Sequence, residues 1–214
     1  KKQIIKANKE VILCAGALET PKLLMLSGVG PADHLKSLGI SVVKDSPAIG
    51  SNLHDHPNVA MFYQGRKPVD FGYPQMYGFQ RFNPALPLPE GQADTCMAWM
   101  SAPVTMQQSM RRMGPASILK GKKFFNPLLR FLVRTAVIIA TSLPPVNKMI
   151  NNLYGIVVIL GKPLSRGTLR LASTNVKEPA LIDLAYFRDP ADMETMLNGI
   201  ACAGDIAAHK GLKE

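Results

Sequence analysis

The fold of this chain is constrained most by one glycine-bounded stretch, GALETPKLLMLSGVG, at residues 16–30. It follows VILCAG, a continuously apolar run that predicts a strand with both faces buried, as in an α/β sheet. Thr20-Pro21 predicts the start of a helix, because the threonine hydroxyl can cap a backbone N–H and proline has none to lose there. Ser27-Gly28 predicts its end. The sequence therefore predicts a strand, a tight turn and a short helix in succession.

The turn between that strand and that helix is the first candidate binding site. Ala15 and Gly16 carry almost no side chain, so a ligand can approach the backbone closely at this end of the strand. The N–H groups and the positive dipole end of a helix that starts near Pro21 would face an anionic group. The same small residues also suit close packing, and the residues alone leave both interpretations open.

Short elements are expected on both sides of the turn. Gln3–Lys6 and Glu10–Cys14, joined by a three-residue connection that contains asparagine, predict a hairpin. Pro31 predicts the start of a second helix, which Gly39 ends because it has no Cβ to oppose a left-handed cap. Residues 40–43, ISVV, predict another strand.

The remainder of the chain predicts strands followed by a long helix. Strands are expected at Val59–Gln64 and Thr95–Ser101, and residues 65–92 between them are expected to form a loop. Further strands are predicted within residues 154–161, 165–173 and 179–187. Residues 189–210 predict a helix that begins at an Asp-Pro pair. Its apolar positions at helical spacing are Met193, Met196, Leu197, Ile200 and Ala203.

The net charge of +10 belongs to one central segment. From Thr95 to Lys177 there is no Asp or Glu, although twelve of the chain's 25 Lys and Arg residues lie there. Its apolar part, residues 128–143, is shorter than the roughly 20 residues that cross a bilayer and is interrupted by Arg130 and Arg134. Nucleic-acid binding fits poorly because aromatic residues make up only 7% of the chain.

Cysteine content and chain length indicate the redox environment of the protein and the extent of the chain. Cys14, Cys96 and Cys202 are odd in number and far apart, so they predict neither a zinc site nor a disulfide framework. Free buried thiols are expected, in a reducing or membrane-associated location rather than a secreted one. With 214 residues, no initiator Met and no signal peptide, the chain is expected to be an internal piece of a longer protein.

Two separated segments carry long, recognisable patterns. Residues 16–30 match Gly-Ala-x-x-Thr-Pro-x-Leu-Leu-x-x-Ser-Gly-Val-Gly, and residues 47–57 match Pro-x-x-Gly-x-Asn-Leu-x-Asp-His-Pro. KPLSRGTLRLAS and PALIDLAYFRDPADMETMLNGI follow much later. In this order the patterns resemble the glucose–methanol–choline (GMC) oxidoreductases, flavoproteins that oxidise alcohols, and in particular choline dehydrogenase-like members. They cover about half of the chain, and residues 60–150 carry no family pattern.

The resemblance implies FAD as the cofactor and a small-molecule alcohol as the substrate. It implies that Ala15 and Gly16 end a strand of the FAD domain and lie against the cofactor. It also implies that Thr20 and Pro21 start the adjoining helix close to the cofactor. For Thr20 the alternative is a plain helix cap.

The resemblance also places Asn52, Asp55 and His56 in a loop between the family's two domains. We expect a hydrogen-bonded structural loop there. His54 and His56 flank Asp55, but two histidines without a third ligand nearby predict no metal site.

No catalytic residue is assigned within this chain. The family's G-x-G-x-x-G turn is absent from it, and the active-site histidine that assists proton removal belongs to a later family segment. His34 and His209 are expected on helix surfaces and lie outside the matching motif. The piece alone is therefore expected to be inactive and to bind FAD poorly.

We predict an α/β plus α+β fold. Residues 1–57 would form part of an FAD-binding α/β domain, and residues 58–214 a substrate-binding domain with a mainly antiparallel sheet and flanking helices. The whole enzyme would be an FAD-dependent alcohol dehydrogenase or oxidase that transfers hydride from a CH–OH group to the flavin. The alternative is a non-catalytic basic protein on the same scaffold.

Two interpretations of the basic segment remain open. In the first, residues 111–150 form an insertion whose apolar face covers the active-site entrance or contacts a membrane surface. In the second, they form a solvated basic face over ordinary core. In the alternative function, the protein would bind a membrane surface through these residues or bind a protein partner.

Overall fold

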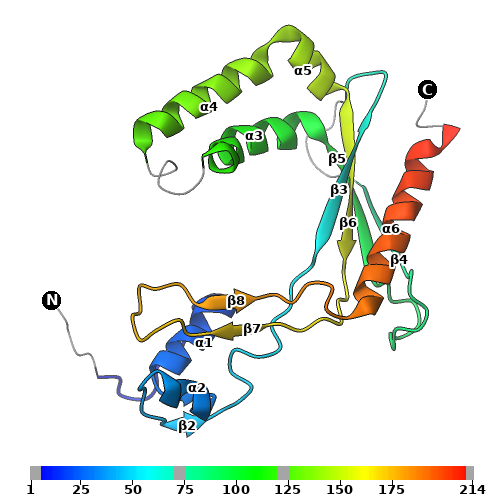
Figure 1. Ribbon diagram of the computed structural model, residues 1–214. Helices are drawn as coiled ribbons and strands as arrows, with labels where there is room; N and C mark the ends of the chain where they lie inside the picture. Colours follow the sequence, from blue (N-terminus) through cyan, green and yellow to red (C-terminus); the bar gives the residue numbers. More distant parts are fainter. Residues whose placement is uncertain (1–5, 70–75, 120–125, 211–214) are drawn as a thin grey trace. The chain divides into compact units, whose positions relative to one another are not determined.

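The secondary structure comes from a computed structural model that describes residues 6–69, 76–119 and 126–210 (Figure 1). The chain divides into two units, which are described separately. Unit 1 comprises residues 1–55 and 164–189, and unit 2 comprises residues 56–163 and 190–214. The return of residues 164–189 to the first unit was not anticipated by the predicted division into 1–57 and 58–214. The functional assignment of those two domains stays a prediction.

Unit 1 is built from short elements contributed by both of its segments. They are α1 (Gly16–Leu26), β1 (Val29–Gly30), α2 (Ala32–Ser37), β2 (Lys44–Asp45), β7 (Thr168–Arg170) and β8 (Leu181–Asp183). Strand β1 pairs with β2 in parallel across α2, and β7 pairs with β8 antiparallel. The core joins Met25 and Leu35 of the two helices to Leu169 and Leu171 of the later segment. Burial of these side chains supplies the main attraction between the two segments.

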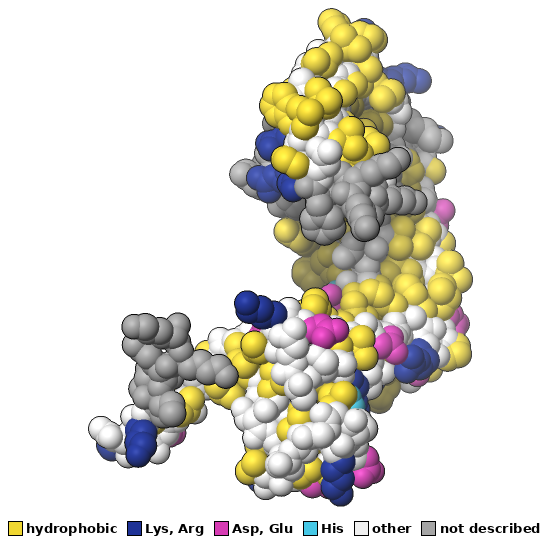
Figure 2. All heavy atoms as spheres, turned by 60° about the vertical axis from the view of Figure 1, so that its left-hand side comes forward, with side chains coloured by type: hydrophobic (Ala, Val, Ile, Leu, Met, Phe, Trp, Pro, Cys, Tyr) yellow, Lys and Arg dark blue, Asp and Glu magenta, His cyan; other side chains and the backbone are white. Residues whose placement is uncertain are grey.

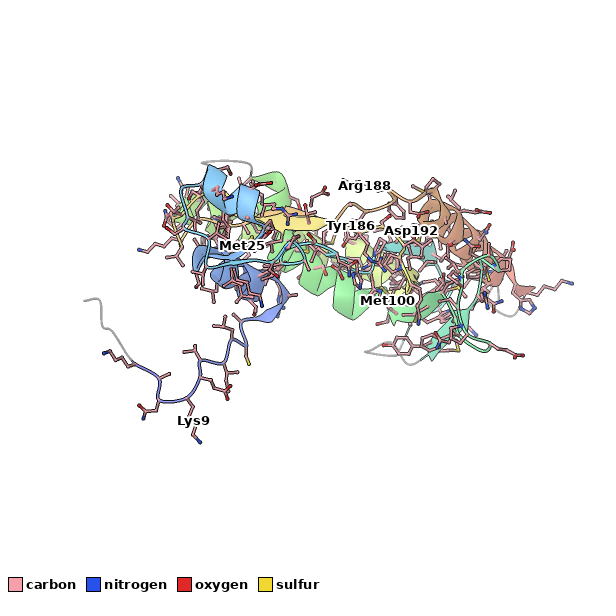
Figure 3. The ribbon with its side chains drawn as sticks, turned by 90° about the horizontal axis from the view of Figure 1, so that it is seen from below. Lys9, Met25, Met100, Tyr186, Arg188 and Asp192 are labelled. Carbon is pink, nitrogen blue, oxygen red and sulfur yellow. The ribbon has the colours of Figure 1, made fainter. Side chains whose placement is uncertain are left out.

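The predicted strand at Glu10–Cys14 is wrong: residues 6–14 form no strand in the described chain. Gln3–Lys6, the other predicted arm of that hairpin, lies mostly outside the described residues. Val11 and Ile12 are 75% and 73% exposed, and Figure 3 shows Lys9 on an open segment. A strand buried on both faces needs neighbouring strands and covering helices. The described residues place none beside this run, so its apolar side chains face solvent.

Helix α1 begins at Gly16, four residues before the predicted start at Thr20. Gly16 has φ +84°, so the chain makes its left-handed turn there and enters the helix at once. Pro21 consequently lies inside the helix rather than at its first position. The second predicted helix is confirmed as α2, and Gly39, with φ +71°, follows its end.

Unit 2 is an antiparallel sheet with helices around it. Its elements are β3 (Asn58–Gln64), β4 (Met76–Gln80), β5 (Thr95–Ser101), α3 (Ala102–Ile118), α4 (Pro127–Ser142), α5 (Pro144–Asn151), β6 (Leu153–Leu160) and α6 (Pro190–Ala208). The strand order is β3-β6-β5-β4, and α6 packs on β5 and β6 (Figure 1). A Cβ at Gly199 of α6 would lie 2.7 Å from Cγ1 of Val158, so glycine permits this close approach.

The predicted fold class is confirmed. A small parallel β-α-β arrangement precedes a mainly antiparallel sheet with flanking helices. The strand predicted at Thr95–Ser101 has those bounds in the structure, and β3 begins one residue before its predicted start. Strand β4 lies inside the predicted loop 65–92, so that prediction is wrong there. Gly78 interrupts its apolar pattern, and the strand forms through its ladder with β5.

Helix α6 confirms the predicted helix at residues 189–210, although its buried face is shifted. Met196 and Ala203 are buried as expected, whereas Met193 and Leu197 are exposed. The buried face of α6 is narrow and includes small residues, Gly199 and Ala203, which allow the helix to approach the sheet closely.

The loop that follows β2 is held against β7 by its backbone. The amide of Leu169 donates to the carbonyl oxygen of Gly50 at 2.7 Å, and Nη1 of Arg170 donates to the same oxygen at 2.6 Å. Leu53 and Gly167 exchange backbone hydrogen bonds of 3.1 and 2.6 Å. We call this set of contacts the Gly50 clamp. It joins the two segments of unit 1 across about 120 residues of sequence.

Gly50→Ala is expected to destabilise the protein more than Gly39→Ala. Both glycines have left-handed backbones, with φ +72° and +71°, so each alanine incurs a similar strain of about 1 kcal/mol. At Gly50 the new Cβ would also collide with the carbonyl oxygen of Leu169, whereas at Gly39 it meets nothing within 4 Å. The collision should add roughly 1–3 kcal/mol. Equal losses in thermal or denaturant unfolding of the two variants would contradict the clamp.

Candidate functional site

A shallow depression on unit 1 lies between α1 and the clamped loop. Its volume is roughly 390 Å³. It is lined by Ala17, Thr20, Pro21, Leu24, Ala48, Ile49, Gly50, Ser51, Asn52, Leu53, His54 and Leu169. Its walls are mostly aliphatic, and two hydroxyls, an amide and an imidazole lie among them. This mixture suits a ligand with a flat apolar part and a few polar groups.

Pro21 shapes the helix wall of the depression. Because proline has no backbone N–H, it cannot donate to the carbonyl oxygen of Ala17, its partner one turn earlier. Ala17 and Pro21 both line the depression. The helix thus brings a backbone acceptor without its usual helical donor to the site.

The four residues predicted to bind a cofactor divide into two pairs. Thr20 and Pro21 line the depression, while Ala15 and Gly16 lie at the start of α1, outside the set of lining residues. Oγ1 of Thr20 accepts a hydrogen bond from the backbone N–H of Ala15 at 3.1 Å. This contact fixes the turn at Gly16 relative to the wall of the depression. Cofactor binding by all four residues stays a prediction.

Asn52 and His54 form the loop side of the depression. Asn52 has φ +59°, a left-handed conformation that asparagine tolerates better than most residues. Nδ1 of His54 is 2.9 Å from the carbonyl oxygen of Asn52, so the imidazole is held by its own loop. Among the described lining residues, His54 has the only ionisable side chain.

Asp55 makes a contact that the sequence did not predict. The hydroxyl of Tyr186 donates to Oδ2 of Asp55 at 3.2 Å, which links the loop to the turn after β8. Burial raises the pKa of Tyr186, and the hydrogen bond and negative charge of Asp55 raise it further. Figure 3 shows Tyr186 and Arg188 on this turn. No spacing rule relates two residues 131 positions apart, so only the fold could reveal the pair.

His56 and His34 hold separate parts of the fold together. Nδ1 of His56 is 3.0 Å from the carbonyl oxygen of Leu160 within unit 2. His34 is not simply on a helix surface: its Nε2 accepts the backbone N–H of Leu171 at 3.0 Å. Burial lowers the pKa of His34, and the positive charge of Arg170 lowers it further. A neutral ring with an unprotonated Nε2 is what this contact requires.

The described residues also bear on the expectations for metal sites and cysteines. Within residues 6–69, 76–119 and 126–210, no group of three or more His, Cys, Asp or Glu side chains could hold a metal ion. Cys14 is exposed, and Cys96 and Cys202 are half-buried, so the expectation of buried thiols is wrong for Cys14. Cys14 follows the exposed apolar run and shares its exposure.

Comparisons with known proteins point to one family. Two sequence models of the GMC oxidoreductase family match residues 1–58 and 163–214. Choline oxidase of Arthrobacter globiformis is 31% identical over 98% of the chain and 32% of that protein. An oxygen-dependent choline dehydrogenase of Sinorhizobium fredii is 29% identical over 99% of the chain and 36% of that protein. The chain thus spans about a third of the length of these relatives.

Solved structures support the fold. A formate oxidase variant of Aspergillus oryzae superposes with a TM-score of 0.68 at 23% identity, over 96% of the chain and 38% of that protein. Pyridoxine 4-oxidase of Mesorbium loti gives a TM-score of 0.62 at 23% identity, over 92% of the chain and 32% of that protein. Both similarities extend over almost the whole chain.

Loss of stability on acidification is expected at His34. The folded-state pKa lies below the unfolded value of about 6.5, so below that pH the unfolded chain binds a proton that the folded chain excludes. Stability should therefore be constant above pH 7 and fall as the pH drops below 6.5. His34→Gln, which retains a neutral acceptor, should weaken this dependence, while His34→Ala should lose roughly 1–3 kcal/mol even at pH 8. Denaturant unfolding between pH 8 and 5.5 measures the pH dependence of stability and the loss in His34→Ala. If stability changed with pH equally in wild type and His34→Gln, His34 would not be the group responsible.

Proposed function

The chain belongs to the GMC oxidoreductase family, and we propose that the whole protein containing it is an FAD-dependent enzyme that oxidises a CH–OH group of a small alcohol. FAD would supply the hydride acceptor, which no amino-acid side chain provides. The names of the relatives, choline oxidase and oxygen-dependent choline dehydrogenase, support an alcohol with a cationic or polar body as the substrate class. The observation that carries the proposal is the depression beside α1, formed by the residues of both family patterns.

The residues of the depression fit part of a dinucleotide. Its volume of roughly 390 Å³ lies at the low end of the range for small-molecule sites, so it can take one portion of FAD rather than the whole. Pro21, Leu24 and Leu169 offer apolar surface for a ring, and backbone at Gly50 and Ser51 lies close by without large side chains. The cofactor would therefore be held mainly by shape and by backbone groups.

We assign the polar residues of this site roles in binding or in positioning the cofactor. Thr20 would offer its hydroxyl to the cofactor while it secures the turn through Ala15. Asn52 and His54 would border the cofactor from the loop, which the Gly50 clamp keeps in place. The family's active-site histidine belongs to a later segment, so we assign His54, which the carbonyl of Asn52 holds in place, no role in moving the substrate proton. We propose that the proton acceptor comes from a part of the protein beyond these residues.

Flavin content and alcohol oxidation of the whole protein test this function. The purified protein should show the visible absorption of bound FAD. Addition of an alcohol substrate under anaerobic conditions should decrease that absorption. Choline and simple primary alcohols, scanned with an artificial electron acceptor, would then define the substrate. A protein that remains colourless after incubation with FAD would overturn the proposal and favour a non-catalytic role on this scaffold.

Thr20→Val should lower FAD affinity about tenfold, the effect of losing one hydrogen bond of about 1.4 kcal/mol. Thr20→Ser retains the hydroxyl and should restore most of the affinity. Thr195→Val is the matched control, because Thr195 donates to the carbonyl oxygen of Ala191 inside α6 and lies in unit 2. Flavin fluorescence titration of the apoprotein gives the dissociation constants. If Thr20→Val binds FAD like Thr195→Val, Thr20 only caps the turn.

A further inference from the structure

Helix α4 has an apolar face that the described part of the chain leaves exposed. Leu128, Phe131, Leu132 and Ile139 are each more than half exposed, and their spacing places them on one side of the helix. We call these four side chains the outer stripe. The other side of α4 faces α3. Even a methyl group added at Gly114 of α3 would lie 3.4 Å from Cγ2 of Val137, and Thr141 of α4 is buried. The described residues of unit 2 therefore leave the outer stripe uncovered.

Arginines lie directly beside the outer stripe. Arg112, Arg130 and Arg134, together with Phe131, line a depression of roughly 500 Å³ between α3 and α4. Pro115, Ala116 and Pro127 complete its lining. Figure 2 shows hydrophobic side chains and Lys or Arg side chains gathered together at the end of unit 2 that carries α4 and α5. The surface thus combines apolar area with positive charge.

Negative charge is missing from the whole stretch of sequence around this surface. No Asp or Glu occurs between Thr95 and Lys177. A second copy of the chain applied face to face would bring arginines against arginines with no carboxylate between them, which is unfavourable. An occupant must therefore be apolar and carry negative groups of its own.

We propose that the outer stripe and its arginines bind the surface of an anionic lipid bilayer. A helix of 16 residues is about 24 Å long and could lie along the headgroup region with its apolar side chains inserted. Arg112 and Arg134 would meet lipid phosphates at the edge of the inserted side chains. Among the described residues no single helix is long and apolar enough to cross a membrane, although α4 and α5, bent by 74°, pass such a test as a pair.

The proposal is independent of the proposed chemistry. It concerns unit 2 only and requires neither FAD nor an alcohol, so a colourless protein that binds vesicles would sustain it. An enzyme active on an alcohol that ignores vesicles would overturn it and leave the proposed function intact.

Vesicle flotation of the whole protein tests the membrane surface. The protein should float with vesicles of phosphatidylcholine mixed with phosphatidylglycerol, float far less with phosphatidylcholine alone, and detach as salt screens the charges. Phe131→Ser should lower the partition coefficient about tenfold, and Arg134→Gln about fivefold. The matched controls are Val176→Ser and Lys177→Gln, at exposed positions of unit 1. Circular dichroism and the unfolding midpoint confirm that each variant is folded.

Three results would overturn the lipid proposal. One is the absence of flotation with either vesicle. Another is equal flotation of the two α4 variants and their controls. The third is a wild-type dimer in sedimentation analysis that Phe131→Ser dissociates, because a second copy would then cover the outer stripe.

Discussion

The carbonyl oxygen of Gly50 is the point on which unit 1 depends. It accepts hydrogen bonds from the amide of Leu169 and from Nη1 of Arg170, and so closes a loop of about 120 residues. Closing so long a loop costs conformational entropy, which hydrogen bonds alone do not offset. The buried side chains of Met25, Leu35 and Leu169 contribute the remaining attraction. Backbone contacts thus set the register, and apolar burial supplies the stability.

This closure joins residues from both segments that the family models match. The family models match residues 1–58 and 163–214, and unit 1 is formed from residues 1–55 and 164–189. Residues that build the depression must keep both their backbone conformation and their small size, because a Cβ at Gly50 would collide with Leu169. Residues 59–162, which contain most of β3 and all of β4 to β6 and α3 to α5, lie between the two matched segments.

The sequence predicted what depends on local signals. Glycine and proline punctuation predicted α2, and apolar runs predicted β3, β5 and β6. Two of the four predicted binding residues, Thr20 and Pro21, line the depression, and a local Thr-Pro signal in the sequence was enough to identify them. Long-range contacts could not be predicted. Nε2 of His34 finds the amide of Leu171 only in the folded unit, and buried Asp94 accepts the amides of Phe82 and Asn83 across a turn that looks like loop.

Two exposed apolar surfaces on the chain call for different partners. At Val11 and Ile12 the exposed residues lie on a segment without described secondary structure, so any partner must also satisfy backbone N–H and C=O groups, as a neighbouring strand does. In α4 the backbone groups are already bonded within the helix, and only side chains remain to be covered. A lipid surface cannot satisfy an unpaired backbone but can cover the side chains of a helix. The lipid proposal for the outer stripe meets these demands, whereas a lipid surface would leave the backbone at Val11 and Ile12 unpaired.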